Sequence, residues 1–157
     1  MLSEPAWNTS YSWGFELTYY LPHVMAVVFI VFLSLIDEPL KLHQFLRAAL
    51  ALSIATVLSH LDRWFDLWPG HPYFASGHMT FVAGVAASLG FLRSWTALLT
   101  LPLLVPYGIA LNKLGFHCPL DIFGAIPIVL IVYILIYKYW TIKPPSAAPL
   151  DMAPESP

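Results

Sequence analysis

Charged side chains are scarce in this sequence. Only 10% of its 157 residues are Asp, Glu, Lys or Arg, whereas 59% are hydrophobic. A soluble domain usually carries about 25% charged residues, so water is not the main solvent of this chain. Almost all of the Lys and Arg residues stand between apolar stretches rather than within them. That separation favours a protein that crosses a membrane several times.

The sequence also has little cysteine and no excess of basic residues. Cys118 is the one cysteine, so the chain forms no internal disulfide. Seven Lys and Arg stand against nine Asp and Glu, which gives a formal net charge of -2. Nucleic-acid-binding proteins usually present a basic surface, so the charge balance excludes that class.

Five apolar stretches have a length suited to crossing a bilayer. Charges, prolines and glycines interrupt them, above all in residues 60–75, which we expect to form a loop. The expected spans cover about residues 20–36, 45–59, 76–92, 95–111 and 119–140. The sequence therefore predicts an all-α, polytopic transmembrane helical bundle of about five spans.

The two ends of the chain differ from these spans. Residues 1–19 combine polar side chains with Trp, Tyr and Phe, whose rings settle at the level of lipid headgroups, so they predict an interfacial N-terminal arm. Residues 144–157 are rich in proline and predict a disordered tail. Residues 20–143 then form one transmembrane domain.

The basic residues indicate how this domain is oriented. An odd number of spans places the two termini on opposite sides of the membrane. Only Arg63 and Lys113 fall on the side of the N-terminus. The basic residues on the side of the tail are Lys41, Arg47, Arg93, Lys138 and Lys143. Because basic loops stay in the cytoplasm, we expect the tail there and the segments near residues 60–78 and 112–121 on the outer face.

A Ser-Gly-His element begins the expected third span. Ser76 is suited to cap this helix, and Gly77 allows a ligand to approach the backbone. The free N–H groups and the dipole of a helix N-terminus favour an anion. His78 would then stand beside that anion as a proton donor.

A His-x-x-x-Asp element begins the expected fifth span. Pro119 suits the first helical position, and Asp121 follows His117 by four residues. A carboxylate at that reach can orient an imidazole and support its positive charge, so His117 is a candidate nucleophile. Two crossings separate this element from Ser76-Gly77-His78, so both belong to the same face of the membrane.

These two elements resemble the second and third motifs of the type 2 phosphatidic acid phosphatase superfamily, whose members are helical membrane enzymes that hydrolyse lipid phosphates without a metal. The resemblance covers about residues 60–140. It implies that His117 attacks phosphorus to give a phosphohistidine, that Asp121 orients His117, and that His78 protonates the leaving alkoxide. It also implies that Ser76 and Gly77 bind phosphate oxygens.

The sequence departs from that family at its basic motif positions. The first motif, a Lys followed six residues later by Arg-Pro, is missing, and Leu111 occupies the position of the third-motif arginine. Arg63 and Lys113 are the nearest basic residues, and we interpret both as candidate phosphate-binding side chains, with ordinary interfacial cations as the alternative.

Other readings of the same residues remain open. The site could transfer a phospholipid head group to a lipid alcohol, or it could bind a lipid phosphate without turnover. A metal site built from His60, His71, His78, His117 and Asp121 lacks ligand-like spacing, so we expect neither metal nor cofactor. We interpret His60 and His71 as loop histidines that face water, and His23 and His43 as structural. The expected location is a bacterial cytoplasmic membrane, with the site on its periplasmic or outer face.

Overall fold

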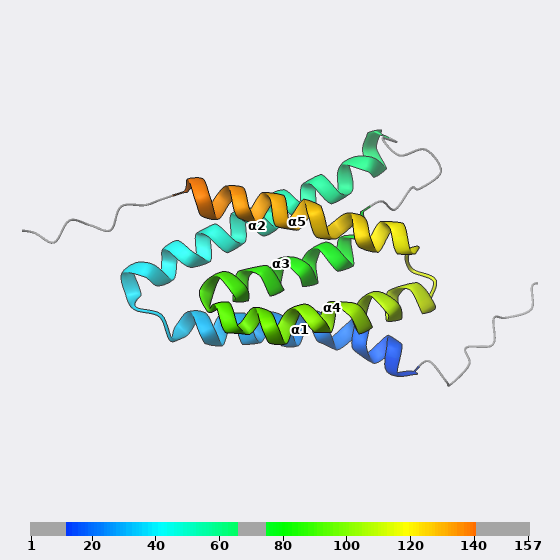
Figure 1. The fold of residues 1–157 in the computed structure, drawn as a ribbon, viewed down its shortest axis with the longest axis horizontal. Helices are drawn as coiled ribbons and strands as arrows, with labels where there is room; N and C mark the ends of the chain where they lie inside the picture. The colour runs from blue at the N-terminus through cyan, green and yellow to red at the C-terminus, as the bar shows by residue number, and fades with distance from the viewer. Residues whose placement is uncertain (1–11, 66–74, 141–157) are drawn as a thin grey trace, which may run out of the picture.

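The chain folds as an all-helical bundle (Figure 1). This computed structural model describes residues 12–65 and 75–140. Its helices are α1 (Ser12–Ser34), α2 (Glu38–Phe65), α3 (Gly77–Leu92), α4 (Ser94–Lys113) and α5 (Pro119–Tyr139). Successive helices run in opposite directions, so the beginning of α1 and the end of α5 lie at opposite ends of the bundle (Figure 1). The predicted all-α fold is confirmed.

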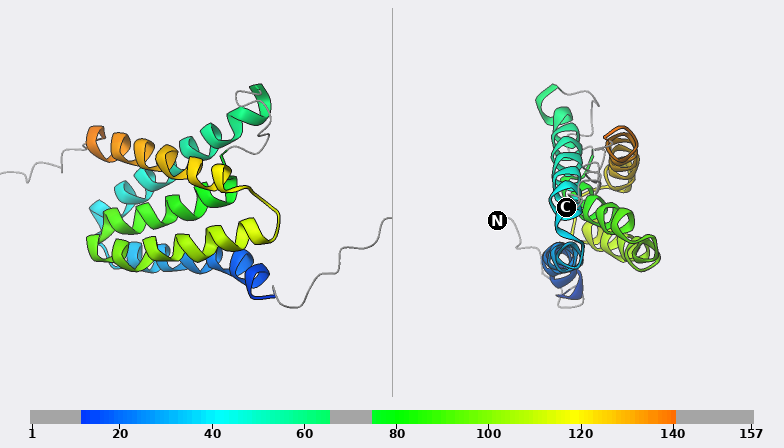
Figure 2. Two further views of the ribbon diagram at one scale, coloured as in Figure 1. Left: turned by 45° about the vertical axis from the view of Figure 1, so that its right-hand side comes forward. Right: turned by 90° about the vertical axis from the view of Figure 1, so that its left-hand side faces the viewer.

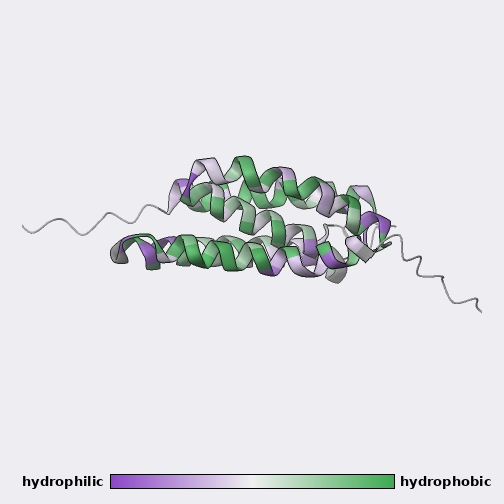
Figure 3. Ribbon diagram, turned by 90° about the horizontal axis from the view of Figure 1, so that it is seen from below, coloured by the Kyte–Doolittle hydropathy of each residue, from purple (hydrophilic) through white to green (hydrophobic). Residues whose placement is uncertain are grey.

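Four of these helices are long and apolar enough to cross a membrane. The spans are Trp13–Ser34, Leu40–Leu61, Ser94–Lys113 and Pro119–Tyr139. A helix rises about 1.5 Å per residue, so each is close to the roughly 30 Å of a bilayer core. Hydrophobic residues dominate the middle of the helices, and hydrophilic residues gather toward their ends (Figure 3). The chain is therefore an integral membrane protein.

Helix α3 is shorter, with 16 residues, and contacts all four other helices. It lies between α5 and the pair formed by α1 and α4, a position visible from two further sides (Figure 2). Small residues allow this close packing: a Cβ added to Gly84 would lie 2.6 Å from Leu52 Cδ1 and 3.3 Å from the Tyr133 hydroxyl. Membrane helices commonly associate through such small residues.

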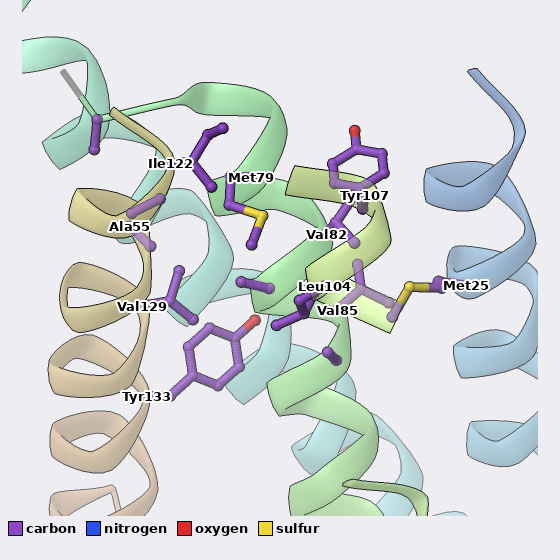
Figure 4. Close-up of a cluster of buried hydrophobic side chains, with 14 of the residues drawn as sticks. Met25, Ala55, Met79, Val82, Val85, Leu104, Tyr107, Ile122, Val129 and Tyr133 are labelled. Atoms are coloured by element: carbon purple, nitrogen blue, oxygen red, sulfur yellow. The ribbon is translucent and has the colours of Figure 1, made fainter. Parts of the chain in front are cut away.

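The core surrounds α3 and contains two buried tyrosines (Figure 4). Tyr133 is fully buried, and its hydroxyl lies 2.9 Å from Ser88 Oγ, so this polar group is satisfied inside the apolar interior. Tyr107 is also fully buried, with its ring between α3 and α1. Many large apolar side chains instead face outward, as a bilayer requires.

Two helix boundaries differ from the sequence prediction. Helix α1 begins at Ser12 rather than near Tyr20, so residues 12–19 of the expected interfacial arm continue the first span. Helix α2 continues to Phe65, so residues 60–65 are helical and their assignment to a loop was wrong. Charged residues do not end a helix that emerges from the apolar layer, and the strong breakers Pro69 and Gly70 come only later.

The helix ends define two ends of the bundle. The motif end contains the beginnings of α1, α3 and α5 and the ends of α2 and α4, and the tail end contains the opposite termini (Figure 1). Lys41, Arg93 and Lys138 belong to the tail end. Arg47 lies six residues beyond Lys41 on α2, donates a hydrogen bond to the Trp140 carbonyl, and has its guanidinium carbon 5.4 Å from the centroid of the Tyr137 ring. Residues 1–11 of the predicted interfacial arm and the whole predicted tail, residues 144–157, lie outside the described residues.

Candidate functional site

The Ser-Gly-His and His-x-x-x-Asp elements meet at the motif end. The Ser76 N–H donates a hydrogen bond to the Asp121 carbonyl oxygen at 2.8 Å. This bond joins the residue that precedes α3 to the first turn of α5, although 45 positions separate them in the sequence. The expectation that both elements lie on one face is therefore matched by direct contact.

Ser76 organises the beginning of α3. Its side chain accepts a hydrogen bond from the Met79 N–H at 3.2 Å, and its carbonyl accepts one from the Thr80 N–H at 2.8 Å. The first N–H groups of a helix have no partner in the helix itself, so Gly77 and His78 keep N–H groups that make no bond within the described part of the chain. Ser76 is completely buried, so it caps this N-terminus from the protein interior.

His117 and Asp121 are both buried and face each other. His117 Nδ1 lies 3.9 Å from Asp121 Oδ2, and the two residues are 7% and 4% exposed. That distance is long for a hydrogen bond but allows a charge–charge interaction once His117 is protonated. Asp121 Oδ2 also accepts a hydrogen bond from the Cys118 N–H at 2.9 Å, so the same carboxylate caps α5.

The turn between α4 and α5 places His117 against Asp121. Gly115 has a φ of 73°, a left-handed conformation that ends α4 and that glycine adopts without a steric cost. The Phe116 N–H then donates to the Leu111 carbonyl at 3.0 Å, and the Asn112 side-chain amide donates to the His117 carbonyl at 3.0 Å. Asn112 was not among the predicted site residues, and its place in the last turn of α4, shortly before Gly115, was the available signal.

His78 and His117 stand side by side. Their ring centroids are 5.7 Å apart with an interplanar angle of 62°, and Phe116 stacks on His78 at 6.1 Å. His78 is exposed whereas His117 is buried, so the two imidazoles occupy an outer and an inner position. A group that contacts His78 from outside is within reach of a second, carboxylate-supported imidazole.

A cavity of about 430 Å³ opens beside His78. It lies between α1, α2, α3 and α4 at the motif end. The residues that line it are Thr18, Tyr19, Pro22, His23, His60, Gly77, His78, Phe81 and Tyr107. The structure therefore adds two histidines, His23 and His60, to the surroundings of the predicted site.

His60 is not a loop histidine. It lies in the last two turns of α2, and its Nδ1 is 2.7 Å from the Thr56 carbonyl. A Cβ added to Gly77 would lie 3.1 Å from His60 Cε1, so this imidazole packs directly against the Ser-Gly-His element. This contact was not predicted, because we expected the second span to end at residue 59 and His60 to lie in a loop.

Arg63 and Lys113, the two basic residues predicted to bind phosphate, lie at the ends of different helices. Arg63 belongs to the last turn of α2, and its side chain lies outside the described residues, as does all of His71. Lys113 ends α4 and does not line the histidine cavity. It lines a separate apolar groove of about 530 Å³ between α4 and α5, together with Asn112 and Met79.

No protein-family model, curated protein or solved structure matches this chain. The relation to the type 2 phosphatidic acid phosphatase superfamily stays a prediction from the two motifs. Among the described residues, no group of three or more His, Cys, Asp or Glu is arranged to hold a metal ion.

Proposed function

We propose that this protein is a membrane lipid phosphatase that works through a phosphohistidine at His117. The observation that carries the proposal is the contact between His78 and His117, with Asp121 behind His117 and the free helix N-terminus of α3 beside them. A nucleophile, a proton donor, an orienting carboxylate and an anion-binding backbone are the parts that phosphoryl transfer needs.

Each imidazole has its own role in this proposal. His117 Nδ1 faces the Asp121 carboxylate, and we assign the attack on phosphorus to Nε2. In the first step a P–N bond forms at His117 and the P–O bond to the lipid alcohol breaks, and protonated His78 gives its proton to the leaving oxygen. In the second step water attacks the phosphohistidine, its proton passes to His78, and inorganic phosphate leaves.

The backbone at the beginning of α3 supports the charge on the phosphoryl group. The Gly77 and His78 N–H groups are not used by the helix, and the helix dipole adds partial positive charge at this point. Gly77 carries no side chain that would cover these donors. Preorganised donors of this kind stabilise the transition state because they need no reorganisation during the reaction.

The bundle provides a place for the lipid chain. The groove between α4 and α5 is apolar, is lined by Met79, and ends at Asn112 and Lys113 beside the motif end. An acyl or isoprenoid chain in this groove would keep its phosphate at the level of His117, on the outer face of the membrane. A lipid phosphate or diphosphate is therefore the substrate class that we propose.

Phosphate release from purified protein in detergent tests this function. Phosphatidic acid, phosphatidylglycerol phosphate and a polyprenyl diphosphate would be compared, with EDTA present. We expect release that His117→Ala abolishes and that His43→Ala leaves unchanged, because His43 lies near Trp140 at the tail end. If a lipid alcohol accepts the head group instead of water, the protein is a transferase. If His117→Ala affects only lipid binding, the protein binds lipid phosphates without turnover.

A further inference from the structure

The cavity beside His78 contains two imidazoles that the mechanism above does not use. His23 comes from α1 and His60 from α2, and they share the cavity with His78 from α3. Ionisable residues inside membrane helices are costly, so their convergence from three helices indicates a function. Among the described residues, those that line the cavity include neither a carboxylate nor a lysine or arginine.

Both additional imidazoles are held in the same way. His60 Nδ1 lies 2.7 Å from the Thr56 carbonyl, and His23 Nδ1 lies 2.7 Å from the Tyr19 carbonyl. A carbonyl oxygen only accepts hydrogen bonds, so Nδ1 carries the proton in each ring. Nε2 is the nitrogen that remains for another partner, and on His60 it lies on the ring edge that packs against Gly77.

Tyr107 supplies a second, independent observation. Its side chain is fully buried and lines the cavity, and its hydroxyl has no hydrogen-bond partner among the described residues. The hydroxyl points away from Leu104 and Val85, toward the end of the bundle where α3 begins (Figure 4). Burying a hydroxyl without a partner is costly, so a ligand that accepts a hydrogen bond here would stabilise the arrangement.

We propose that this cavity binds a phosphoryl group beside Gly77 and His78, with His23, His60 and Tyr107 as donors to its oxygens. Histidine takes up a proton near neutral pH, and a protonated ring donates through both nitrogens. With Nδ1 bonded to the helix, Nε2–H of each ring is available to the anion. The ligand class is a phosphate monoester or free phosphate, and the inference rests on the proposed phosphatase function for the source of that phosphate.

Binding of inorganic phosphate to the full chain in detergent is the direct test, measured by calorimetry alongside turnover of the lipid substrate. His23→Gln, His60→Gln and Tyr107→Phe would be compared with His43→Gln, a matched substitution on α2 at the tail end. Hydrogen bonds to a charged partner are strong, so we expect each cavity variant to weaken phosphate binding by roughly tenfold or more and to raise KM. His43→Gln should bind as the original chain does.

The outcomes separate the two proposals. The phosphate cavity is overturned if the original chain binds no phosphate. It is also overturned if all three cavity variants bind phosphate within twofold of the original chain. Both results count against the cavity even where lipid hydrolysis is found. Binding that the variants weaken, in a protein that hydrolyses no lipid, supports the cavity and overturns the phosphatase. Tyr107→Phe removes one oxygen and keeps the ring, so this comparison stays informative if a histidine variant fails to fold.

Discussion

The Asp121 carboxylate caps a helix and, under the proposed function, also orients the nucleophile. Oδ2 caps the first turn of α5 through the Cys118 N–H and also faces His117. Oδ1 is buried and has no hydrogen-bond partner among the described residues. Substitutions at this residue therefore change stability and turnover together, unless the replacement keeps the cap.

Asp121→Asn separates the two roles. The amide oxygen of Asn still accepts from the Cys118 N–H, but the negative charge beside His117 is gone. We expect turnover to fall by roughly a hundredfold or more, with nearly unchanged thermal unfolding in detergent. Asp121→Ala should lose turnover and also about 1 kcal/mol of stability, because the cap is removed. Normal turnover in Asp121→Asn would assign Asp121 a purely structural role.

From the sequence we could predict which two motifs lie together, but not which other residues surround them. Ser76-Gly77-His78 and His117 to Asp121 were placed on one face because two crossings separate them, and the structure joins them by one hydrogen bond. The positions of His23 and His60 could not be predicted in this way. Which helices pack against α3 depends on side-chain complementarity between distant segments, and hydrophobic periodicity contains no information about it.

At the scale of elements, α3 determines the packing of the bundle. Its glycines and alanines admit the side chains of neighbouring helices, most closely where Leu52 approaches Gly84. Its 16 residues span about 24 Å, less than a bilayer core, and its neighbours cover it on several sides. The number of helices was predictable from apolar stretches, whereas this central position was not.

Gly84→Val tests this packing. The added atoms would collide with Leu52 and approach the Tyr133 hydroxyl, so we expect a loss of about 1–3 kcal/mol in unfolding free energy. The measurement is thermal or denaturant unfolding in detergent. Leu52→Ala in the same chain creates space on the α2 side and should recover part of that loss. Equal stability of Gly84→Val and the original chain would contradict the close approach.

If the groove between α4 and α5 holds the lipid chain, filling it should weaken the binding of long-chain substrates. Ile109 lines this groove and is half-exposed, so Ile109→Trp should fill part of it without disturbing the core. We expect KM for a long-chain lipid phosphate to rise several-fold, while turnover of a short, water-soluble phosphate ester stays unchanged. An equal effect on both substrates would mean that the lipid chain binds outside this groove.

At the scale of the whole molecule, the sorting of charge between the two ends predicts its orientation. Lys41, Arg93 and Lys138 lie at the tail end, which should face the cytoplasm. In a chain with Cys118→Ser, a membrane-impermeant thiol reagent should label Phe65→Cys in intact cells. It should label Ser94→Cys only after lysis. The reverse labelling pattern would place the histidines in the cytoplasm.

If the protein acts on a lipid, the weak contact between α4 and α5 offers that lipid a route from the side. Of the helices that follow each other in the chain, these two touch least, whereas each also packs against α3. The bond from Ser76 to Asp121 fixes α5 to α3 and does not involve α4. Separation of α4 from α5 would therefore admit a lipid directly from the bilayer while Asp121 keeps its bond to Ser76. Substrate would arrive by lateral diffusion in the membrane, without leaving it for water.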